Sequence, residues 1–356
     1  MQDRVNKLRS LFVDQGLDGY YITSPENRYY LSGFTGSSGA LLVGREKAYL
    51  ITDFRYTSQA EQQCKGYDIV ETKANDYTAL NNLCHDEQIR RLGCEGDNLT
   101  YTAFMALQKE LAGVVLQPEA GFIEVLRMHK DAHELSCIEE AVRIADLAFA
   151  GIISRIKPGV TEAQIALELE YTIRRLGAEG IGFDTIVASG IRSSMPHGVA
   201  SDKAIEPGDL VTMDFGAVYR GYHSDMTRTV VVNQVSPRQQ ELYAIVLEAQ
   251  QSGIEAVKAG VRASDVDRVA RDVISKKGYG AYFGHGTGHG LGLSIHEKPS
   301  LSARDDTILT AGMVVTIEPG IYLPEWGGIR IEDTVIVEDE GCRILTTSPK
   351  EKLLIL

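Results

Sequence analysis

The C-terminal part of this 356-residue chain contains an internal repeat. The segment KPGV at 157–160 recurs as KAGV at 258–261, and Gly177 recurs as Gly278, each pair 101 residues apart. A repeat at a fixed distance indicates that one supersecondary unit occurs twice and buries its apolar face against its copy. This feature constrains the fold more than any other in the sequence.

Each copy begins with two predicted helices. They cover the ranges 134–157, 161–176, 236–258 and 264–277. Thr161 and Gln164 form a capping-box pattern at the start of the second helix. Ser236 precedes a proline at the start of the third helix, and Ser264 is the expected N-cap of the fourth.

Each copy ends in two strands, and each strand carries one acidic residue. Residues 208–216 align with 312–320, and 225–230 align with 332–337. The four acids are Asp214, Asp225, Glu318 and Glu332. We therefore predict a duplicated α+β domain, in which one curved antiparallel sheet is formed from both copies and the helices cover its outer face.

The acids of each copy are expected to face one another. Asp214 and Asp225 lie on either side of a predicted turn at 219–221, so they should be roughly opposite each other, where side chains approach to ~5 Å. Glu318 and Glu332 flank a loop in the same way.

Asp214 and Glu318 lie in strongly apolar strands, where an ionised carboxylate is costly unless a cation holds it. Arg228 and Arg330 are the nearby cations in the sequence, and they are too few for four acids. A pair of divalent metal ions explains the acids better than ion pairs do.

The segment 284–296, GHGTGHGLGLSIH, contains three of the chain's eight histidines: His285, His289 and His296. Imidazoles are common metal ligands and proton shuttles, and glycines let the backbone approach whatever the histidines hold. Carboxylates with an imidazole suit Mn²⁺, Co²⁺, Zn²⁺ or Fe²⁺. Two such ions ~3.5–4 Å apart generate a nucleophilic hydroxide at neutral pH, so we predict a dinuclear metallohydrolase.

Residues 1–125 are predicted to form a smaller α/β domain, joined by a linker at 126–133 to the domain at 134–356. Its predicted helices cover 5–15, 56–64, 77–88 and 101–111, and its predicted strands cover 19–23, 40–43, 48–52 and 67–71. The segment 34–39 is expected to be a loop between strands.

Composition restricts the partners and the compartment. A net charge of −13 argues against nucleic-acid binding, and no apolar run approaches the ~20 residues of a membrane helix. The five cysteines are scattered without a CxxC pair, and the first residues resemble an amphipathic helix rather than a signal peptide. We expect a cytoplasmic protein with reduced thiols.

Several motifs together resemble the pita-bread metallopeptidases, which include methionine aminopeptidases, Xaa-Pro aminopeptidases and prolidases. They are VASGIRSSMPHG, MDFGAVYRGYHSDMTRT, HGTGHGLGLSIH, TIEPGIY and GIRIEDT. The N-terminal NRYYLSGFTGSSGALLV is similar to the creatinase-type domain of the proline-specific branch. The resemblance implies a duplicated pita-bread catalytic domain of the creatinase/methionine aminopeptidase kind. A creatinase-type N-terminal α/β domain precedes it, as in a bacterial Xaa-Pro dipeptidase.

The resemblance also implies five metal ligands. Asp214 would chelate one ion, Asp225 and Glu332 would bridge both, and His289 and Glu318 would complete the second site. Glu318 would in addition act as a general base. The expected ions are two Mn²⁺, with Co²⁺ or Zn²⁺ as alternatives.

Four further residues are expected at the substrate by the same resemblance. His285 would line the pocket, His296 would bind the substrate or the tetrahedral intermediate, and His197 would lie beside it. Arg330 would orient carboxylates or bind the substrate's C-terminus.

The implied reaction is hydrolysis of the imide bond between an N-terminal residue and proline, most simply in Xaa-Pro dipeptides, by a homodimer. The alternative is a Xaa-Pro aminopeptidase that acts on longer peptides. Creatinase has the same fold without metals, but all five ligand positions here are competent to bind metal. A non-catalytic binding module is the remaining alternative, and such relatives characteristically lose ligands.

Overall fold

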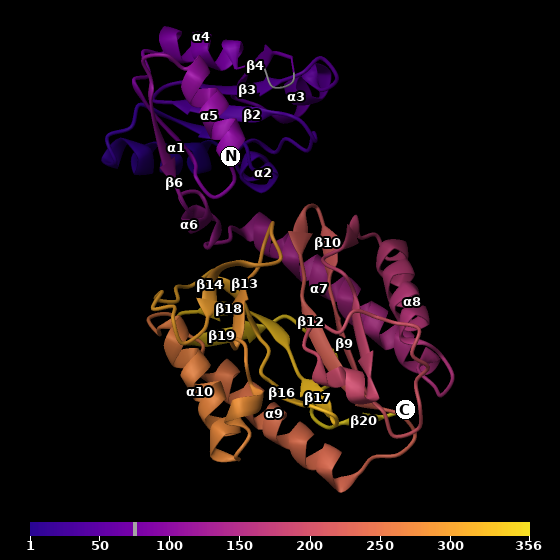
Figure 1. Ribbon diagram of the computed structural model, residues 1–356. Helices are drawn as coiled ribbons and strands as arrows, with labels where there is room; N and C mark the ends of the chain where they lie inside the picture. The colour runs from indigo at the N-terminus through magenta and orange to yellow at the C-terminus, as the bar shows by residue number, and fades with distance from the viewer. Residues whose placement is uncertain (74–76) are drawn as a thin grey trace. The chain divides into compact units, whose positions relative to one another are not determined.

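The protein divides into two compact units in a computed structural model that describes residues 1–73 and 77–356 (Figure 1). The units are Met1–Arg127 and Met128–Leu356. Among the described residues, no helix combines the length and the apolar character needed to span a membrane.

The N-terminal unit is built on a six-stranded mixed sheet with the order β4-β3-β2-β1-β5-β6. Its strands are β1 (Gly19–Ile22), β2 (Ala40–Gly44), β3 (Ala48–Thr52), β4 (Asp68–Glu71), β5 (Arg91–Glu95) and β6 (Val115–Glu119). Its helices are α1 (Gln2–Asp14), α2 (Pro25–Ser32), α3 (Thr57–Gln63), α4 (Thr78–Asp86), α5 (Tyr101–Glu110) and α6 (Glu124–Arg127). Every element predicted in this part is present, whereas α2, α6, β5 and β6 were not predicted.

Helix α2 was not predicted from the sequence, although capping residues mark its start and its end. Ser24 accepts a hydrogen bond from the Asn27 N–H, and Pro25 occupies the first turn, so local capping chemistry starts the helix. Gly33 ends it with a φ of 73°. The segment 34–39 is a loop as predicted, but it connects a helix, rather than a strand, to β2.

The C-terminal unit contains four long helices, two from each copy of the repeat (Figure 1). They are α7 (Ala132–Ile152), α8 (Glu162–Arg175), α9 (Pro237–Ala256) and α10 (Ala263–Lys276). Three short 3₁₀ turns accompany them: η1 (Ile153–Arg155), η2 (Gly190–Ser194) and η3 (Gly280–Tyr282). The predicted capping box of Thr161 and Gln164 is present in α8, and Ser236 caps α9.

The N-cap predicted at Ser264 is wrong, because Arg262 occupies that position and provides no side-chain cap. The first N–H groups of α10, those of Ala263 and Ser264, donate instead to the carbonyls of Thr307 and Asp305. Main-chain carbonyl groups of a neighbouring segment therefore accept hydrogen bonds from N–H groups that a capping side chain would otherwise bind.

The strands of the C-terminal unit form two main sheets, one in each half, rather than the single sheet expected. The first has the order β20-β12-β9-β8 and the second has the order β14-β13-β15-β18-β19. Their members are β8 (Ile186–Ser189), β9 (Leu210–Phe215), β12 (Met226–Val231), β20 (Leu354–Ile355), β13 (Gly288–Gly290), β14 (Glu297–Leu301), β15 (Val314–Ile317), β18 (Asp333–Glu338) and β19 (Gly341–Ile344). The Glu332 N–H donates to the Thr227 carbonyl at 3.2 Å and links the halves.

Smaller ladders extend the tips of both hairpins. They are formed by β7 (Gly180–Ile181), β10 (Ala217–Tyr219) and β11 (Tyr222–His223) in the first half, and by β16 (Gly320–Leu323) and β17 (Gly327–Arg330) in the second. The tip of the first hairpin turns at Arg220 and Gly221, inside the turn predicted at 219–221.

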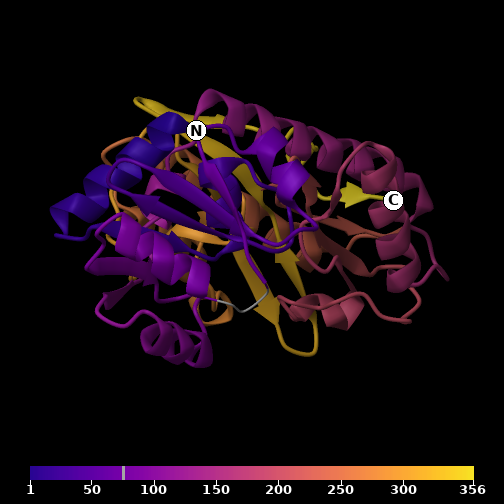
Figure 2. The same ribbon diagram turned by 90° about the horizontal axis from the view of Figure 1, so that it is seen from above.

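Apolar side chains pack the helices of the C-terminal unit against its sheets. Figure 2 shows the ribbon of these helices and strands from above. Ile144 of α7 and Leu169 of α8 share one core cluster with Met213 of β9 and Val230 of β12. A second cluster joins α10 to β15 and β18, and a third surrounds α9. The predicted duplicated α+β architecture is thus confirmed, with a core under each half.

Asp214 and Asp225 approach each other as expected, but diagonally rather than directly across the ladder. Asp214 lies opposite Thr227 in the ladder, so Asp225 is its diagonal neighbour. The chain leaves the ladder at Gly216, where a Cβ atom would lie 1.9 Å from the Ser224 carbonyl oxygen. Only glycine permits that close approach, which carries the chain into the β10–β11 tip.

Candidate active site

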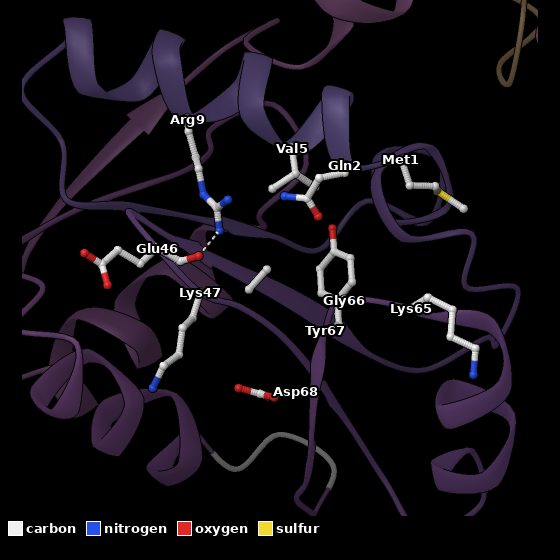
Figure 3. A pocket seen from close by; sticks show the side chains of 11 residues that line it. Met1, Gln2, Val5, Arg9, Glu46, Lys47, Lys65, Gly66, Tyr67 and Asp68 are labelled. Carbon is white, nitrogen blue, oxygen red and sulfur yellow. Dashed lines mark hydrogen bonds between the residues drawn. The ribbon is translucent and has the colours of Figure 1, made fainter.

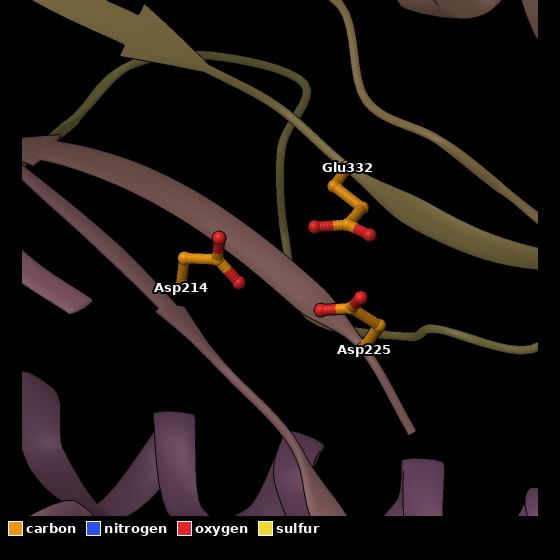
Figure 4. A group of neighbouring side chains, drawn as sticks. All are labelled: Asp214, Asp225 and Glu332. Atoms are coloured by element: carbon orange, nitrogen blue, oxygen red, sulfur yellow. The ribbon is translucent and has the colours of Figure 1, made fainter. Parts of the chain in front are cut away.

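Three carboxylates converge at the centre of the C-terminal unit (Figure 4). Asp214 projects from β9, Asp225 directly precedes β12, and Glu332 lies between β17 and β18. One ligand atom from each lies within 4.8 Å of the others. Because Glu332 comes from the second copy, folding of the whole repeat is needed to assemble the group.

Each of these carboxylates has an oxygen without a partner. Asp214 Oδ1, Asp225 Oδ1 and Glu332 Oε1 are buried and accept no hydrogen bond from the protein. Burial, and then the neighbouring carboxylates, raise the pKa of both Asp225 and Glu332 well above its usual range. A divalent cation would satisfy the free oxygens and remove the mutual repulsion, so the donor set fits a metal.

His289 and Glu318 lie beside this group. His289 Nε2 is 3.5 Å from Asp225 Oδ2 and 3.4 Å from Glu318 Oε1. Its Nδ1 lies 3.0 Å from the Gly290 carbonyl, which can only accept, so Nδ1 donates there and Nε2 is the nitrogen that faces the acids. An imidazole nitrogen that faces two carboxylates is placed as a ligand of a cation would be.

The glycines near His289 also allow close packing of the backbone, in addition to the role that was expected of them. A Cβ atom on Gly288 would lie 1.9 Å from the Thr316 carbonyl oxygen, and one on Gly290 would lie 2.3 Å from that of Lys298. These glycines allow β13 to lie close against the neighbouring chain. They therefore fix the position of His289, and Gly288 also lines the cavity of the site.

Arg330 connects the carboxylates to the rest of the site. Its Nη2 donates to Asp214 Oδ2 at 2.6 Å, its Nε donates to Thr227 Oγ1 at 3.0 Å, and its Nη1 donates to the Tyr322 hydroxyl at 2.8 Å. Every nitrogen of the guanidinium group is thus engaged with protein atoms, which favours orientation of carboxylates over binding of a substrate terminus. Arg228 pairs instead with Asp333.

His285 is held in one tautomer. Its Nδ1 lies 2.8 Å from the Gly286 carbonyl and its Nε2 lies 2.8 Å from the Tyr322 hydroxyl, so Nδ1 donates and Nε2 accepts. Burial, reinforced by Arg330, lowers the pKa of His285 to about 4. Burial also raises the pKa of Tyr322 to about 12. Tyr322 was not predicted, although it follows Glu318 by four residues in TIEPGIY.

A cavity of about 460 Å³ opens onto this group. All nine predicted site residues line it: His197, Asp214, Asp225, His285, His289, His296, Glu318, Arg330 and Glu332. The ring centroids of His289 and His296 are 4.3 Å apart. Apolar walls, which the sequence did not indicate, come from Phe183, Ile186, Pro196, Val199 and Ile295.

The N-terminal unit has a larger cavity, of about 560 Å³, with different chemistry (Figure 3). Its charged lining side chains have mixed signs, and Arg9 is already committed to the carbonyls of Gly44 and Glu46. Among the described residues, the group with metal-binding geometry is the carboxylate group of the C-terminal unit. The candidate metal site therefore opens onto the smaller of these two cavities, the one in the C-terminal unit.

A duplicated α+β fold with buried carboxylates and a histidine around one centre defines a metal-dependent hydrolase. Residues 136–339 match metallopeptidase family M24, and residues 4–129 match the creatinase/prolidase N-terminal domain. The chain belongs to metallopeptidase family M24.

Relatives with proline-specific names cover the whole chain. A Xaa-Pro dipeptidase of Pyrococcus furiosus is 42% identical over 99% of this chain and 100% of its own length. The solved structure of a Xaa-Pro dipeptidase from Bacillus anthracis is 47% identical, with a TM-score of 0.97, and covers 100% of this chain and 99% of its own. That of an X-Pro aminopeptidase from Thermotoga maritima is 41% identical, with a TM-score of 0.90, covering 96% and 98%.

Proposed function

We propose that the protein is a dinuclear-metal exopeptidase that hydrolyses the imide bond between an N-terminal residue and proline, with Xaa-Pro dipeptides as substrates. The carrying observation is the group of buried carboxylates, Asp214, Asp225 and Glu332, whose free oxygens face one another beside His289. The full-length relatives named Xaa-Pro dipeptidase support the substrate class.

The metal ions would be held by Asp214, Asp225, His289, Glu318 and Glu332. When bound, two divalent ions lower the pKa of a water molecule and polarise the scissile carbonyl. Four carboxylates with one imidazole form an oxygen-rich set that suits Mn²⁺, with Co²⁺ or Zn²⁺ as substitutes.

The protein's own groups then handle protons and orientation. Glu318, whose pKa is raised by burial against the influence of His289 and Arg330, would accept the proton of the attacking water. His296 and His197 would donate hydrogen bonds to the substrate carbonyl as negative charge develops on it. Arg330 would hold Asp214 in place through the 2.6 Å hydrogen bond.

The volume and the lining of the cavity support a small substrate. A volume of about 460 Å³ lies within the range of small-molecule sites. Phe183, Val199 and Ile295 would pack on the proline ring and on the side chain before it, because the metal-binding residues that line the same cavity are polar. Binding of the free amino group near the carboxylates would make the enzyme an exopeptidase.

Activity on longer peptides is the second candidate, since one similar structure is named an X-Pro aminopeptidase. The test is hydrolysis of Ala-Pro and Ala-Pro-Ala by the full chain with Mn²⁺, Co²⁺ or Zn²⁺. We expect release of proline from Ala-Pro and much slower cleavage of the tripeptide. Efficient cleavage of Ala-Pro-Ala would make the protein an aminopeptidase.

We also propose that the protein forms a homodimer and that it resides in a reducing compartment. All five cysteines carry free thiols, and four of them are buried, which agrees with a cytoplasmic location. Light scattering coupled to size exclusion tests the dimer, and a monomeric mass would reject it.

A further inference from the structure

Two buried acids outside the metal centre hold the two chain segments that bring histidines to the cavity. We propose that Glu162 and Asp267 are positioning residues. Glu162 would fix the segment that carries His197, and Asp267 would fix the segment that carries His285 and leads into His289. This inference rests on the function proposed above, because that function gives the histidines their roles.

Glu162 is the first residue of α8, and its side chain is completely buried. Its Oε1 accepts hydrogen bonds from the N–H and the hydroxyl of Ser189, at 2.7 and 2.8 Å. Its Oε2 accepts from Arg192 Nε at 2.9 Å, and from the N–H and hydroxyl of Ser201 at 3.1 and 2.6 Å. One carboxylate therefore receives five hydrogen bonds from a single loop.

These bonds close the loop 189–201 at its base. Ser189 ends β8 and Ser201 lies twelve residues later, so both ends of the loop meet on one carboxylate, as in a compact Ω-loop. Arg192 also donates through Nη2 to the Val199 carbonyl at 2.7 Å. His197 and Val199, which line the cavity, project from the part of the loop enclosed by these bonds.

Asp267 makes the corresponding contacts in the second half. Its Oδ1 accepts from the N–H and the hydroxyl of Thr287 at 3.0 and 2.9 Å. Both oxygens accept from Arg271, whose guanidinium donates in turn to the carbonyls of Phe283 and His285 at 2.8 and 2.6 Å. The segment 283–287 is thereby held immediately before β13.

The segment that Asp267 holds continues into the metal site. The Thr287 carbonyl accepts from the Glu318 N–H at 2.7 Å, and His289 follows two residues later in β13. Displacement of Thr287 would therefore move Glu318 and His289. The loop that Glu162 holds reaches the metal site less directly, because its Pro196 carbonyl accepts from Arg330 Nη1 at 3.2 Å and Arg330 in turn donates to Asp214.

The two acids occupy different positions on the equivalent helices of the two halves. An offset of 101 residues relates Glu162 to Ala263 and Ala166 to Asp267, and all four side chains are buried. Positions four residues apart lie on the same face of a helix. Each half thus uses one of two adjacent positions on the equivalent helix for its acid, and an alanine fills the other.

A carboxylate suits this task better than an amide does. It accepts at both oxygens, whereas the amide nitrogen of glutamine or asparagine presents donors to the donors that surround it. Glu162→Gln and Asp267→Asn keep the side-chain volume, so they weaken the loop attachments without opening a cavity. Their effects should differ because the segments that they hold differ.

The experiment compares these two variants with Glu168→Gln and Asp272→Asn, which replace exposed acids on the same two helices. For each metal-free protein we would measure Mn²⁺ affinity by calorimetry and local hydrogen exchange by mass spectrometry. For each loaded protein we would measure kcat and KM on Ala-Pro. The His197→Ala background completes a double-mutant cycle with Glu162→Gln.

Glu162→Gln should lower kcat about 10-fold and leave the Mn²⁺ dissociation constant within about 2-fold. Exchange should increase in 189–201 and stay unchanged elsewhere. In the His197→Ala background its effect on kcat should fall below about 2-fold, because both changes remove the same function. Asp267→Asn should instead weaken Mn²⁺ binding about 10-fold and increase exchange in 283–287.

Additive effects of Glu162→Gln and His197→Ala would overturn the proposal, as would unchanged exchange in 189–201 or equal losses of Mn²⁺ affinity in both variants. If the wild-type protein fails to hydrolyse Ala-Pro, the proposed function fails, whereas exchange and Mn²⁺ affinity still decide the positioning roles. Should either variant fail to fold, Ser201→Ala and Thr287→Val each remove one hydroxyl bond to the same acid. These variants must then change kcat, Mn²⁺ affinity and hydrogen exchange in the same directions, by smaller amounts.

Discussion

Thr227 Oγ1 donates a 2.7 Å hydrogen bond to Glu332 Oε2, although the two residues belong to different copies of the repeat. Arg330 Nε donates to the same hydroxyl oxygen at 3.0 Å, so the Thr227 hydroxyl connects Arg330 to Glu332. Thr334 completes a reciprocal pair by donating to the Asp225 carbonyl at 2.9 Å. Each copy of the repeat therefore contributes a threonine that donates a hydrogen bond to an acidic residue of the other copy.

Thr227→Val should weaken Mn²⁺ binding about 10-fold, because it leaves Glu332 free to turn and removes an acceptor from the buried Arg330. Calorimetric titration of the metal-free protein measures the change. Thr229→Val is the matched control, since Thr229 is buried on the same strand and bonds to Thr212 and Arg330. An equal loss of affinity in both variants would contradict the specific role of Thr227.

His197→Ala should lower kcat on Ala-Pro about 100-fold while the Mn²⁺ dissociation constant stays within about 2-fold. The reason is that His197 lines the cavity but lies outside the group of ligands. Replacement of the exposed His133 by alanine provides the control. If metal content fell together with activity in His197→Ala, the assignment of His197 to the substrate would be wrong.

His285 should make the C-terminal unit less stable in acid. Its folded pKa of about 4 lies below the usual value of 6.5, so the unfolded state binds more protons between these values. Its contribution is complete above about pH 6.5 and is lost as the pH falls toward 4, by about 3 kcal/mol in total.

Urea unfolding of the metal-free protein between pH 4 and pH 7 measures this loss. Trp326, the single tryptophan, reports on the C-terminal unit by fluorescence. His285→Gln should flatten the pH dependence of the unfolding midpoint, while His133→Gln should leave it as in the wild type. A wild-type slope in His285→Gln would contradict the neutral, buried state of His285.

Asp225→Asn should abolish activity without lowering the melting temperature of the metal-free protein. The change removes a carboxyl group whose ionised form is disfavoured by burial and by Asp214 and Glu318, so it relieves that penalty while it removes a proposed ligand. Mn²⁺ should raise the melting temperature of the wild type and of the exposed control Asp339→Asn, but not that of Asp225→Asn. Stabilisation of Asp225→Asn by Mn²⁺ would show that Asp225 is dispensable.

The sequence was informative about the site because the repeat places acids at matched positions. Asp214 and Glu318 stand in apolar strands, and that conflict with burial already indicated a cation. The glycine-rich segment around His289 indicated the proposed nitrogen ligand. Conspicuous residue types in regular strands can be recognised without knowledge of tertiary contacts.

Contacts between distant segments could not be predicted in the same way. The bond from Thr227 to Glu332 joins residues of common type across more than a hundred positions. The diagonal placement of Asp214 and Asp225 depends on the close approach of Gly216 to Ser224. The N-cap expected at Ser264 failed because the carbonyls of Asp305 and Thr307 had already satisfied the first turn.

The most direct test of the account is a titration of the metal-free protein with Mn²⁺ while proline release from Ala-Pro is followed. The five proposed ligands, which come from both copies of the repeat, predict that two ions bind per chain and that full activity requires both. The Glu332→Gln variant should bind fewer ions and release no proline. Saturation at one ion per chain with full activity, or no release of proline at any Mn²⁺ concentration, would contradict a dinuclear Xaa-Pro peptidase.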